Sequence, residues 1–177
     1  KMVVSQPLLY LGYKDNNVGL TGEKHFRKET LTEVLLEIML SPSSRLYNGL
    51  YEEGLIDDQF AASYTGSRDY GHVIIGGETK NPDELSEKLK EGIENFQKKG
   101  LREEDFERKR KKLMGEFLKS FNSLEFVANN YLAKFFQGVD MFAYLKILDE
   151  ITIDEAEARL EELFRDDNLA LSVIEPA

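Results

Sequence analysis

The sequence predicts an α+β fold, with a small, mainly antiparallel sheet and helices packed on it. Short apolar runs typical of strands occur near the start, in the middle and at the end of the chain. Longer stretches between them repeat apolar residues at helical spacing, and two of the strand-like runs are separated by only a short break. Segregated strands and helices of this kind indicate an α+β domain.

The chain length and the absence of an internal boundary predict one domain. A chain of 177 residues can enclose a good-sized core but is short for two domains. No linker, repeat or low-complexity tract divides it, so residues 1–177 are expected to form a single domain. The sequence opens on Lys1, almost inside a strand-like run, and we expect it to be part of a longer polypeptide.

The first predicted elements are a strand over residues 6–14 and a helix over residues 24–40. Apolar side chains occupy both odd and even positions of the strand, which is typical of a strand covered on both faces. The helix is predicted because its apolar residues recur at i, i+3, i+4, i+7 and i+8. These residues are Leu31, Val34, Leu35, Ile38 and Met39. Ser41 and Pro42 end it, because helical backbone is disfavoured before proline.

A short helix and a hairpin are predicted next. Ser43 or Ser44 can cap the helix, which closes at Gly54. The runs 59–67 and 70–78 are rich in strand-forming residues, and the short break between them indicates a hairpin.

The second half of the chain is predicted to be mainly helical. Asn81 is a helix cap followed by Pro82 at the first position and Glu84 at the third, and Gly100 ends that helix. A helix over 102–120 follows, and its buried side is predicted to carry Phe106, Leu113, Met114, Phe117 and Leu118. Two more helices are expected to open at Asn122 with Glu125 and at Thr152 with Glu155. A closing strand contains Leu169, Leu171 and Val173.

Charge and composition exclude several classes of function. The formal net charge of −10 makes nucleic acid a poor partner, because affinity for phosphates comes mainly from Lys and Arg. The basic run 102–112 is expected to be a solvated helix, since its cations can pair with acidic residues four positions away. No apolar run approaches the roughly 20 residues that span a bilayer, and no signal peptide is recognisable. The lack of cysteine excludes disulfides and thiolate chemistry.

Metal ligands are scarce in this sequence. A zinc hydrolase site needs about three protein ligands that converge on one point. The chain has two histidines, His25 and His72. His25 and Glu29 are four residues apart and can share a helical face, but an exposed, highly charged helix start explains them better. His72 is predicted to lie in a strand, as a structural residue or as a contact to substrate.

Residues 43–55 read S-S-R-L-Y-N-G-L-Y-E-E-G-L and resemble the S-S-R-L-F/Y-x-x-L-R-E-x-x-G-L segment of pitrilysin/insulinase-family peptidases. Residues 100–111 resemble the later G-L/I-x-x-E-x-L/F-x-R-x-K helix of that family. Through residues 51–58 and 74–80 the chain is most similar to the bacterial, cytoplasmic zinc-dependent members. The resemblance implies a metallohydrolase-like half-domain, one of two related halves, and a cytoplasmic location.

In that family the first half carries the zinc motif H-x-x-E-H. The motif is absent from this sequence, so the resemblance identifies the chain as the second half. It implies no cofactor in this chain and zinc in the other half. The implied partners are the catalytic half of the same polypeptide or a paralogue, and a peptide substrate. The chain alone is expected to have no activity, whereas its parent is expected to be a zinc metallopeptidase.

The implied function is the non-catalytic half of a zinc-dependent endopeptidase, which completes a closed chamber and binds peptide, in part through an exposed strand edge. The resemblance points to His72, Arg45 and Tyr47 as substrate contacts. His72 and Asp83 align with an Arg and a Tyr that some members place near the scissile bond, and His72 could replace the Arg as a donor to an oxyanion. The alternative is a stand-alone binding or scaffold domain of the same fold with no peptidase role.

Overall fold

The computed structural model describes residues 4–176, and the strands found there form one antiparallel sheet in the order β2-β3-β1-β4. The strands are β1 (Leu8–Lys14), β2 (Ala61–Gly66), β3 (Gly71–Glu78) and β4 (Leu169–Ile174). The helices are α1 (Gly22–Leu40), α2 (Arg45–Glu52), α3 (Pro82–Lys99), α4 (Glu103–Ser120), α5 (Leu124–Phe136), α6 (Ala143–Glu150) and α7 (Ile153–Leu163), and a 3₁₀ turn η1 (Asp166–Asn168) precedes β4. The α+β prediction is confirmed.

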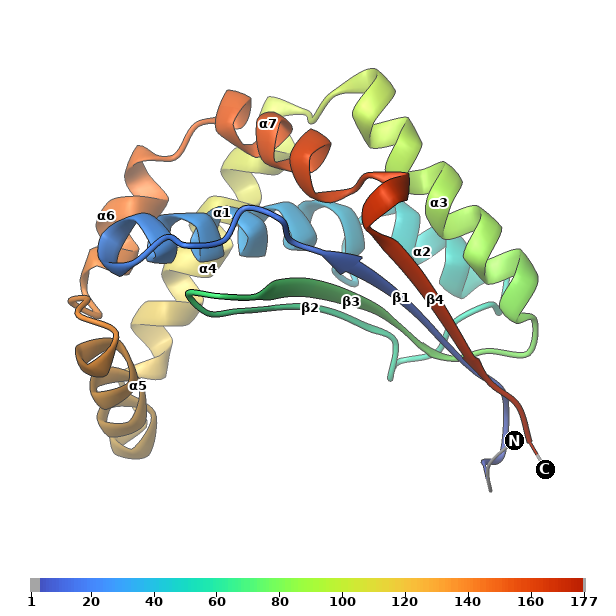
Figure 1. Cartoon of the computed structure of the whole chain (residues 1–177), viewed down its shortest axis with the longest axis horizontal. Helices are drawn as coiled ribbons and strands as arrows, with labels where there is room; N and C mark the ends of the chain where they lie inside the picture. The colour runs from blue at the N-terminus through green and yellow to red at the C-terminus, as the bar shows by residue number, and fades with distance from the viewer. Residues whose placement is uncertain (1–3, 177) are drawn as a thin grey trace.

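The helices cover one face of the sheet and leave the other face open (Figure 1). Leu11 of β1 and Ile75 of β3 are paired in register and fully buried beneath the helices. Their neighbours Tyr10 and Ile74 point to the opposite face and are 36% and 39% exposed. The prediction that the strand over residues 6–14 is covered on both faces is therefore wrong, because the open face lacks a second layer.

Most helix boundaries follow the predicted capping chemistry. The side chain of Asn81 accepts a hydrogen bond from the amide of Glu84 at the start of α3. Thr152 and Glu155 form a complete capping box at the start of α7. Ser44 caps α2 by accepting from the amide of Tyr47.

The second half of the chain departs from the prediction in three places. The cap of α5 is Ser123 and not Asn122, because the Ser123 hydroxyl accepts the amide of Phe126. Leu118 of α4 was expected to be buried but is 58% exposed. Helix α6 was not predicted as an element.

Helix α5 projects from the body of the molecule beside α4 (Figure 1). None of its residues is buried, and several large apolar side chains face solvent. The most exposed of them are Leu124 at 86%, Phe136 at 82% and Phe135 at 61%.

A buried cluster of charges around Asp15 joins four parts of the fold. Asp15 lies directly after β1, and its side chain is 1% exposed. Arg159 of α7 and Lys28 of α1 donate to its Oδ2 atom at 2.7 and 2.9 Å. The hydroxyl of Tyr64 on β2 donates to the same atom at 2.7 Å. Arg159 also donates to the Thr32 hydroxyl of α1 at 3.0 Å.

The balance of forces on Asp15 favours its ionised form. Burial by itself would raise the pKa of Asp15. The hydrogen bonds from Arg159, Tyr64 and Lys28, together with the charge of Arg159, overcome that effect and hold the pKa well below its ordinary value. Asp15 in turn raises the pKa of Tyr64, adding to the effect of burial on that phenol. The tyrosine therefore remains a donor.

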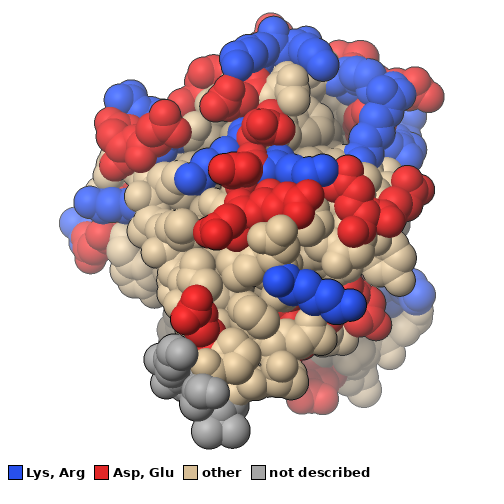
Figure 2. All heavy atoms as spheres, turned by 90° about the vertical axis from the view of Figure 1, so that its right-hand side faces the viewer, with Lys and Arg blue, Asp and Glu red and all other residues tan. Residues whose placement is uncertain are grey.

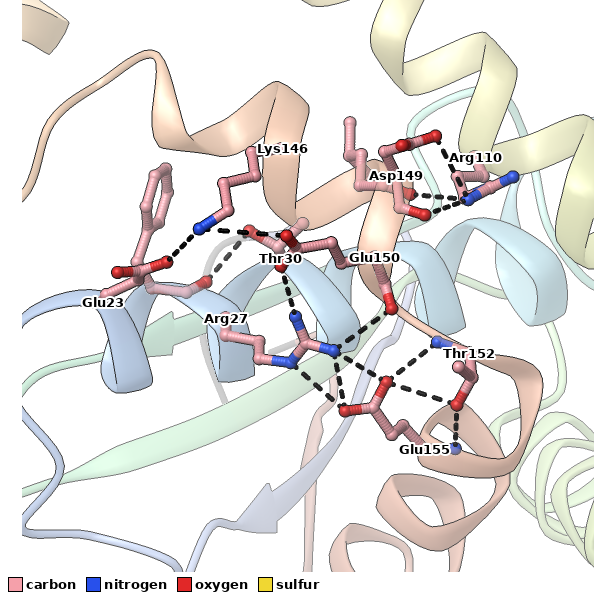
Figure 3. A network of polar contacts seen from close by, with 11 residues as sticks. Glu23, Arg27, Thr30, Arg110, Lys146, Asp149, Glu150, Thr152 and Glu155 are labelled. Atoms are coloured by element: carbon pink, nitrogen blue, oxygen red, sulfur yellow. Dashed lines mark hydrogen bonds and ion pairs between the residues drawn. The ribbon is translucent and has the colours of Figure 1, made fainter.

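A second ionic contact fastens α1 to the start of α7 (Figure 3). The guanidinium of Arg27 on α1 points toward the turn between α6 and α7. There it donates to Glu155, the capping-box residue, at 2.9 Å and to the carbonyl oxygen of Glu150 at 3.3 Å. One carboxylate thus both caps α7 and holds that helix against α1.

We expect Asp15→Asn to lower the free energy of unfolding by about 3–5 kcal/mol, because it removes the ion-pair partner of the buried Lys28 and leaves the buried Arg159 with only the partly exposed carboxylate of Glu162. Urea denaturation at pH 7 measures this change. Asp69→Asn is the matched control, since the Asp69 side chain is 88% exposed. Equal stability of the two variants would contradict the assigned role of Asp15.

The same cluster predicts an acid-sensitive fold. Asp15 has a lower pKa in the folded chain than in the unfolded chain, so its stabilising contribution is complete above the unfolded value of about 4 and is lost as the pH falls further. Unfolding curves between pH 7 and pH 3 should show a smaller loss of stability for Asp15→Asn than for the unchanged chain. Parallel losses in the two proteins would count against this interpretation.

Candidate peptide-binding groove

The described residues form a groove of about 770 Å³. It lies between β2 and the helices α1, α4 and α5, and we call it the β2–α5 groove. Its apolar wall includes Phe26, Leu36, Leu113, Phe117 and Tyr144. The ring of Tyr144 packs against Phe117 and Phe26, with centroid distances of 4.9 and 5.9 Å. An apolar wall of this kind can hold the aliphatic parts of a bound chain.

Four carboxylates stand along the groove. Glu29, Glu33 and Glu37 follow one another at intervals of four residues on α1, so they lie on one stripe of that helix. Glu116 of α4 also lines the groove. Lys134 of α5 is the single cationic residue among the lining residues that the structure describes. The groove is therefore acidic.

Three of these carboxylates pair with lysines of the fold, and one of the three, Glu116, lies 3.5 Å from Lys112 within α4. Lys134 lies 3.0 Å from Glu29, while Lys112 and Lys109 lie 2.8 and 3.5 Å from Glu37. These contacts connect α1 to α4 and α5, and so they hold the helices that form the walls of the groove.

Glu33 is different, because among the described residues no cation pairs with it. Its carboxylate accepts a hydrogen bond from the Tyr144 hydroxyl at 2.7 Å and remains exposed to the groove. Desolvation by the surrounding protein atoms raises the pKa of Glu33, and the charges of Glu37 and Glu116 raise it further, although the Tyr144 hydrogen bond and the charge of Lys134 oppose the shift. The pKa of Tyr144 is raised as well, through burial and the charge of Glu33. The pair consists of a tyrosine donor and a carboxylate whose charge lacks a partner.

Lys109 is the buried cation behind this acidic stripe. Its side chain is 2% exposed, and its amine donates to the hydroxyls of Ser41 and Ser43. Burial lowers the pKa of the Lys109 amine, although the nearby Glu37 opposes that shift. The prediction that the basic run 102–112 forms a solvated helix with charges paired within it is therefore only partly correct, because Lys109 is buried. Arg110, too, turns from the helix surface to the carbonyl oxygens of Leu148 and Asp149 (Figure 3).

Strand β2 is an edge strand, and it borders the groove. At the hairpin, the Ser67 amide donates to the Tyr70 carbonyl at 2.8 Å. Hydrogen-bonded and non-hydrogen-bonded residue pairs alternate along two antiparallel strands. Counting back from the hydrogen-bonded residue Ser67, Ala62 and Tyr64 of β2 belong to non-hydrogen-bonded pairs. Their backbone N–H and C=O groups thus point away from β3, along the free edge of the sheet.

His72, the predicted substrate contact, lies in β3 opposite Thr65 of β2. It is half-buried on the open face of the sheet, where its ring stacks on Tyr70 at a centroid distance of 6.4 Å. Tyr64, which lines the groove, points to the helix-covered face. The structure thus separates His72 from the β2–α5 groove by the thickness of the sheet, and its contact with substrate stays a prediction.

The other predicted contacts, Arg45 and Tyr47, lie together in the first turn of α2. The side chain of Arg45 is exposed. Tyr47 is buried, packs edge-on against Phe60 and donates through its hydroxyl to the carbonyl oxygen of Asp57. Tyr47 thereby fixes the segment that leads into β2, while substrate contacts by Arg45 and Tyr47 also stay predictions.

The described residues offer no cluster of three or more His, Asp or Glu side chains that could hold a metal ion. His25 does lie 3.2 Å from Glu29, as their spacing suggested. Contrary to the prediction of an exposed helix start, His25 is 7% exposed, and Lys134 holds the same glutamate. The pair is part of the packing between α1 and α5.

The fold and the groove thus define an α+β domain with a free sheet edge beside an acidic cavity and, in the described part of the chain, no cluster of metal ligands. The family model described as "Peptidase M16 inactive domain" matches residues 1–113. The chain belongs to this family. It is also 31% identical over 176 residues to the uncharacterized zinc protease YmfH of Bacillus subtilis (strain 168), and it spans 41% of the length of that relative.

Solved structures agree with this assignment. A candidate M16-like peptidase from Alicyclobacillus acidocaldarius matches 99% of the chain with a TM-score of 0.95 and 32% identity, over 42% of its own length. The inactive peptidase domain of a candidate zinc protease from Bordetella parapertussis matches 100% of the chain with a TM-score of 0.79 and 17% identity, over 94% of its own length. The match to the Bordetella parapertussis domain shows a similarity of fold alone.

Charged side chains are unevenly distributed over one face of the molecule. On the face where α3 and the chain ends lie, acidic and basic side chains alternate over the upper part, and the lower part is largely uncharged (Figure 2). In the part of the chain described here, every helix is too short or too polar to cross a bilayer.

We expect this chain to retain no stoichiometric zinc after equilibration with zinc chloride and desalting. The reason is that, within residues 4–176, the His25–Glu29 pair has no third ligand beside it, and Glu29 already contacts Lys134. Atomic absorption of the desalted protein checks this, with His25→Ala as the comparison. One zinc per chain that disappears in His25→Ala would overturn the assignment.

Proposed function

We propose that this chain is the non-catalytic half of a zinc-dependent endopeptidase, where it completes the substrate chamber and binds peptide. Family membership supports the peptidase context, and the free edge of β2 beside the groove supports the binding role. Zinc, its bound water and the general base then belong to the catalytic half, in the same polypeptide or in a paralogue. A cytoplasmic location is part of the same proposal.

The single observation that carries this proposal is the outward-facing backbone of Ala62 and Tyr64 on the edge of β2. An extended peptide can add to such an edge as a further strand, and its main-chain hydrogen bonds would be independent of its sequence. Alternate side chains of the added strand then point toward the helix layer, where the groove lies. This arrangement suits extended, unfolded segments, whose backbone groups are free to pair.

We expect Ala62→Pro to weaken binding of an extended peptide about tenfold, because it removes an outward-facing N–H donor and obstructs the edge. Fluorescence anisotropy with a labelled peptide measures the affinity. Ala62→Ser keeps the donor and should bind like the unchanged chain. Unaltered affinity in a folded Ala62→Pro variant would rule out strand addition at β2.

His72 generates a separate prediction for the whole protein. If it donates a hydrogen bond to the developing oxyanion, His72→Ala should lower kcat roughly a hundredfold with little change in KM. His72→Gln retains a donor and should recover part of that loss. Cleavage of a fluorogenic peptide provides both constants, and an unchanged kcat in His72→Ala would remove His72 from the reaction.

A further inference from the structure

We propose that the β2–α5 groove selects extended segments that carry a Lys or Arg side chain, which pairs with the carboxylate of Glu33. This inference rests on the proposed function, because it assumes that a peptide lies along β2. It adds the chemical identity of the side chain that enters the groove.

Glu33 differs from Glu29 and Glu37, its neighbours on the same stripe of α1, in the partner of its carboxylate. Glu29 and Glu37 each contact a lysine of the fold at 3.0 and 2.8 Å. Glu33, one helical turn from each, has a tyrosine hydroxyl as its partner and has no cation among the described residues. A carboxylate without an ion-pair partner is stabilised when an external cation reaches it.

Glu33 lies within reach of a strand that would pair with β2. Glu33 and Tyr64 both line the groove, and α1 packs against β2. A peptide strand on the free edge of β2 would direct alternate side chains toward this helix layer. A side chain from such a strand can therefore enter the groove and approach Glu33 without a change in the fold.

The walls of the β2–α5 groove combine apolar and acidic side chains. Phe26, Leu36 and Tyr144 supply apolar surface around the acidic stripe. Lys and Arg carry a long aliphatic stem with a charge at its tip, so the stem can pack on these walls while the charge meets Glu33. A short or acidic side chain gains neither contact, and an acidic one would be repelled by the carboxylate of Glu33.

The test compares three labelled peptides of about nine residues, identical except for a central Arg, norleucine or Glu. The peptides are titrated into this chain once circular dichroism has established that it is folded on its own. We expect the Arg peptide to bind roughly tenfold more tightly than the norleucine peptide, and the Glu peptide to bind more weakly still.

Glu33→Gln should abolish the preference for Arg while leaving the affinity for the norleucine peptide unchanged. The matched control is Glu87→Gln on α3, which removes one exposed carboxylate outside the groove and should keep the preference. If Arg and norleucine peptides bind equally well to the unchanged chain, the selectivity is refuted and strand binding survives. If Glu33→Gln retains the preference, Glu33 is not its source. If none of the peptides binds, the proposed function fails together with this inference.

Discussion

The buried carboxylate of Asp15 is the constraint on which the rest of the fold depends. It accepts hydrogen bonds from α1, α7 and β2 at the point where β1 ends, so it fixes how the helix layer sits on the sheet. Tyr64 takes part in this cluster and also lines the β2–α5 groove. Lys28 precedes Glu29 and Glu33 on the same helix. The distance between the free sheet edge and the acidic stripe of α1 is therefore set by the same interactions that stabilise the core.

The distribution of charge follows a consistent division. The lysines that pair with Glu29 and Glu37 also tie helices together: Lys134 joins α5 to α1, and Lys109 and Lys112 join α4 to α1. Glu33 lies between Glu29 and Glu37 on α1 and forms no ion pair among the described residues. An inactive domain of a peptidase family needs no metal ligands of its own, and this one instead presents backbone groups, apolar walls and an unpaired carboxylate. Such features can hold a substrate without acting on it chemically.

Local signals in the sequence were enough to predict the α+β class, the hairpin and the caps at Asn81 and Thr152, because these depend on residues a few positions apart. The capping box of α7 is an example, since both partners lie within one turn. The coverage of β1 and the inward turn of Lys109 could not be predicted, as they depend on which segment packs against them. The groove was missed for the same reason. The spacing of Glu29, Glu33 and Glu37 is visible in the sequence, but their different partners on α4, α5 and α6 are visible only in three dimensions.

The unburied apolar side chains of α5 have a consequence for the behaviour of the isolated domain in solution. The exposed apolar surface of α5 favours association between molecules, and it includes Leu124, Phe135 and Phe136. The formal net charge of −10 has the opposite effect, because it makes the molecules repel one another. At low ionic strength the repulsion extends over tens of ångströms, and at physiological salt it fades within about 8 Å. The colloidal stability of the domain is thus a balance that added salt shifts toward self-association, and purification buffers of low ionic strength suit it best.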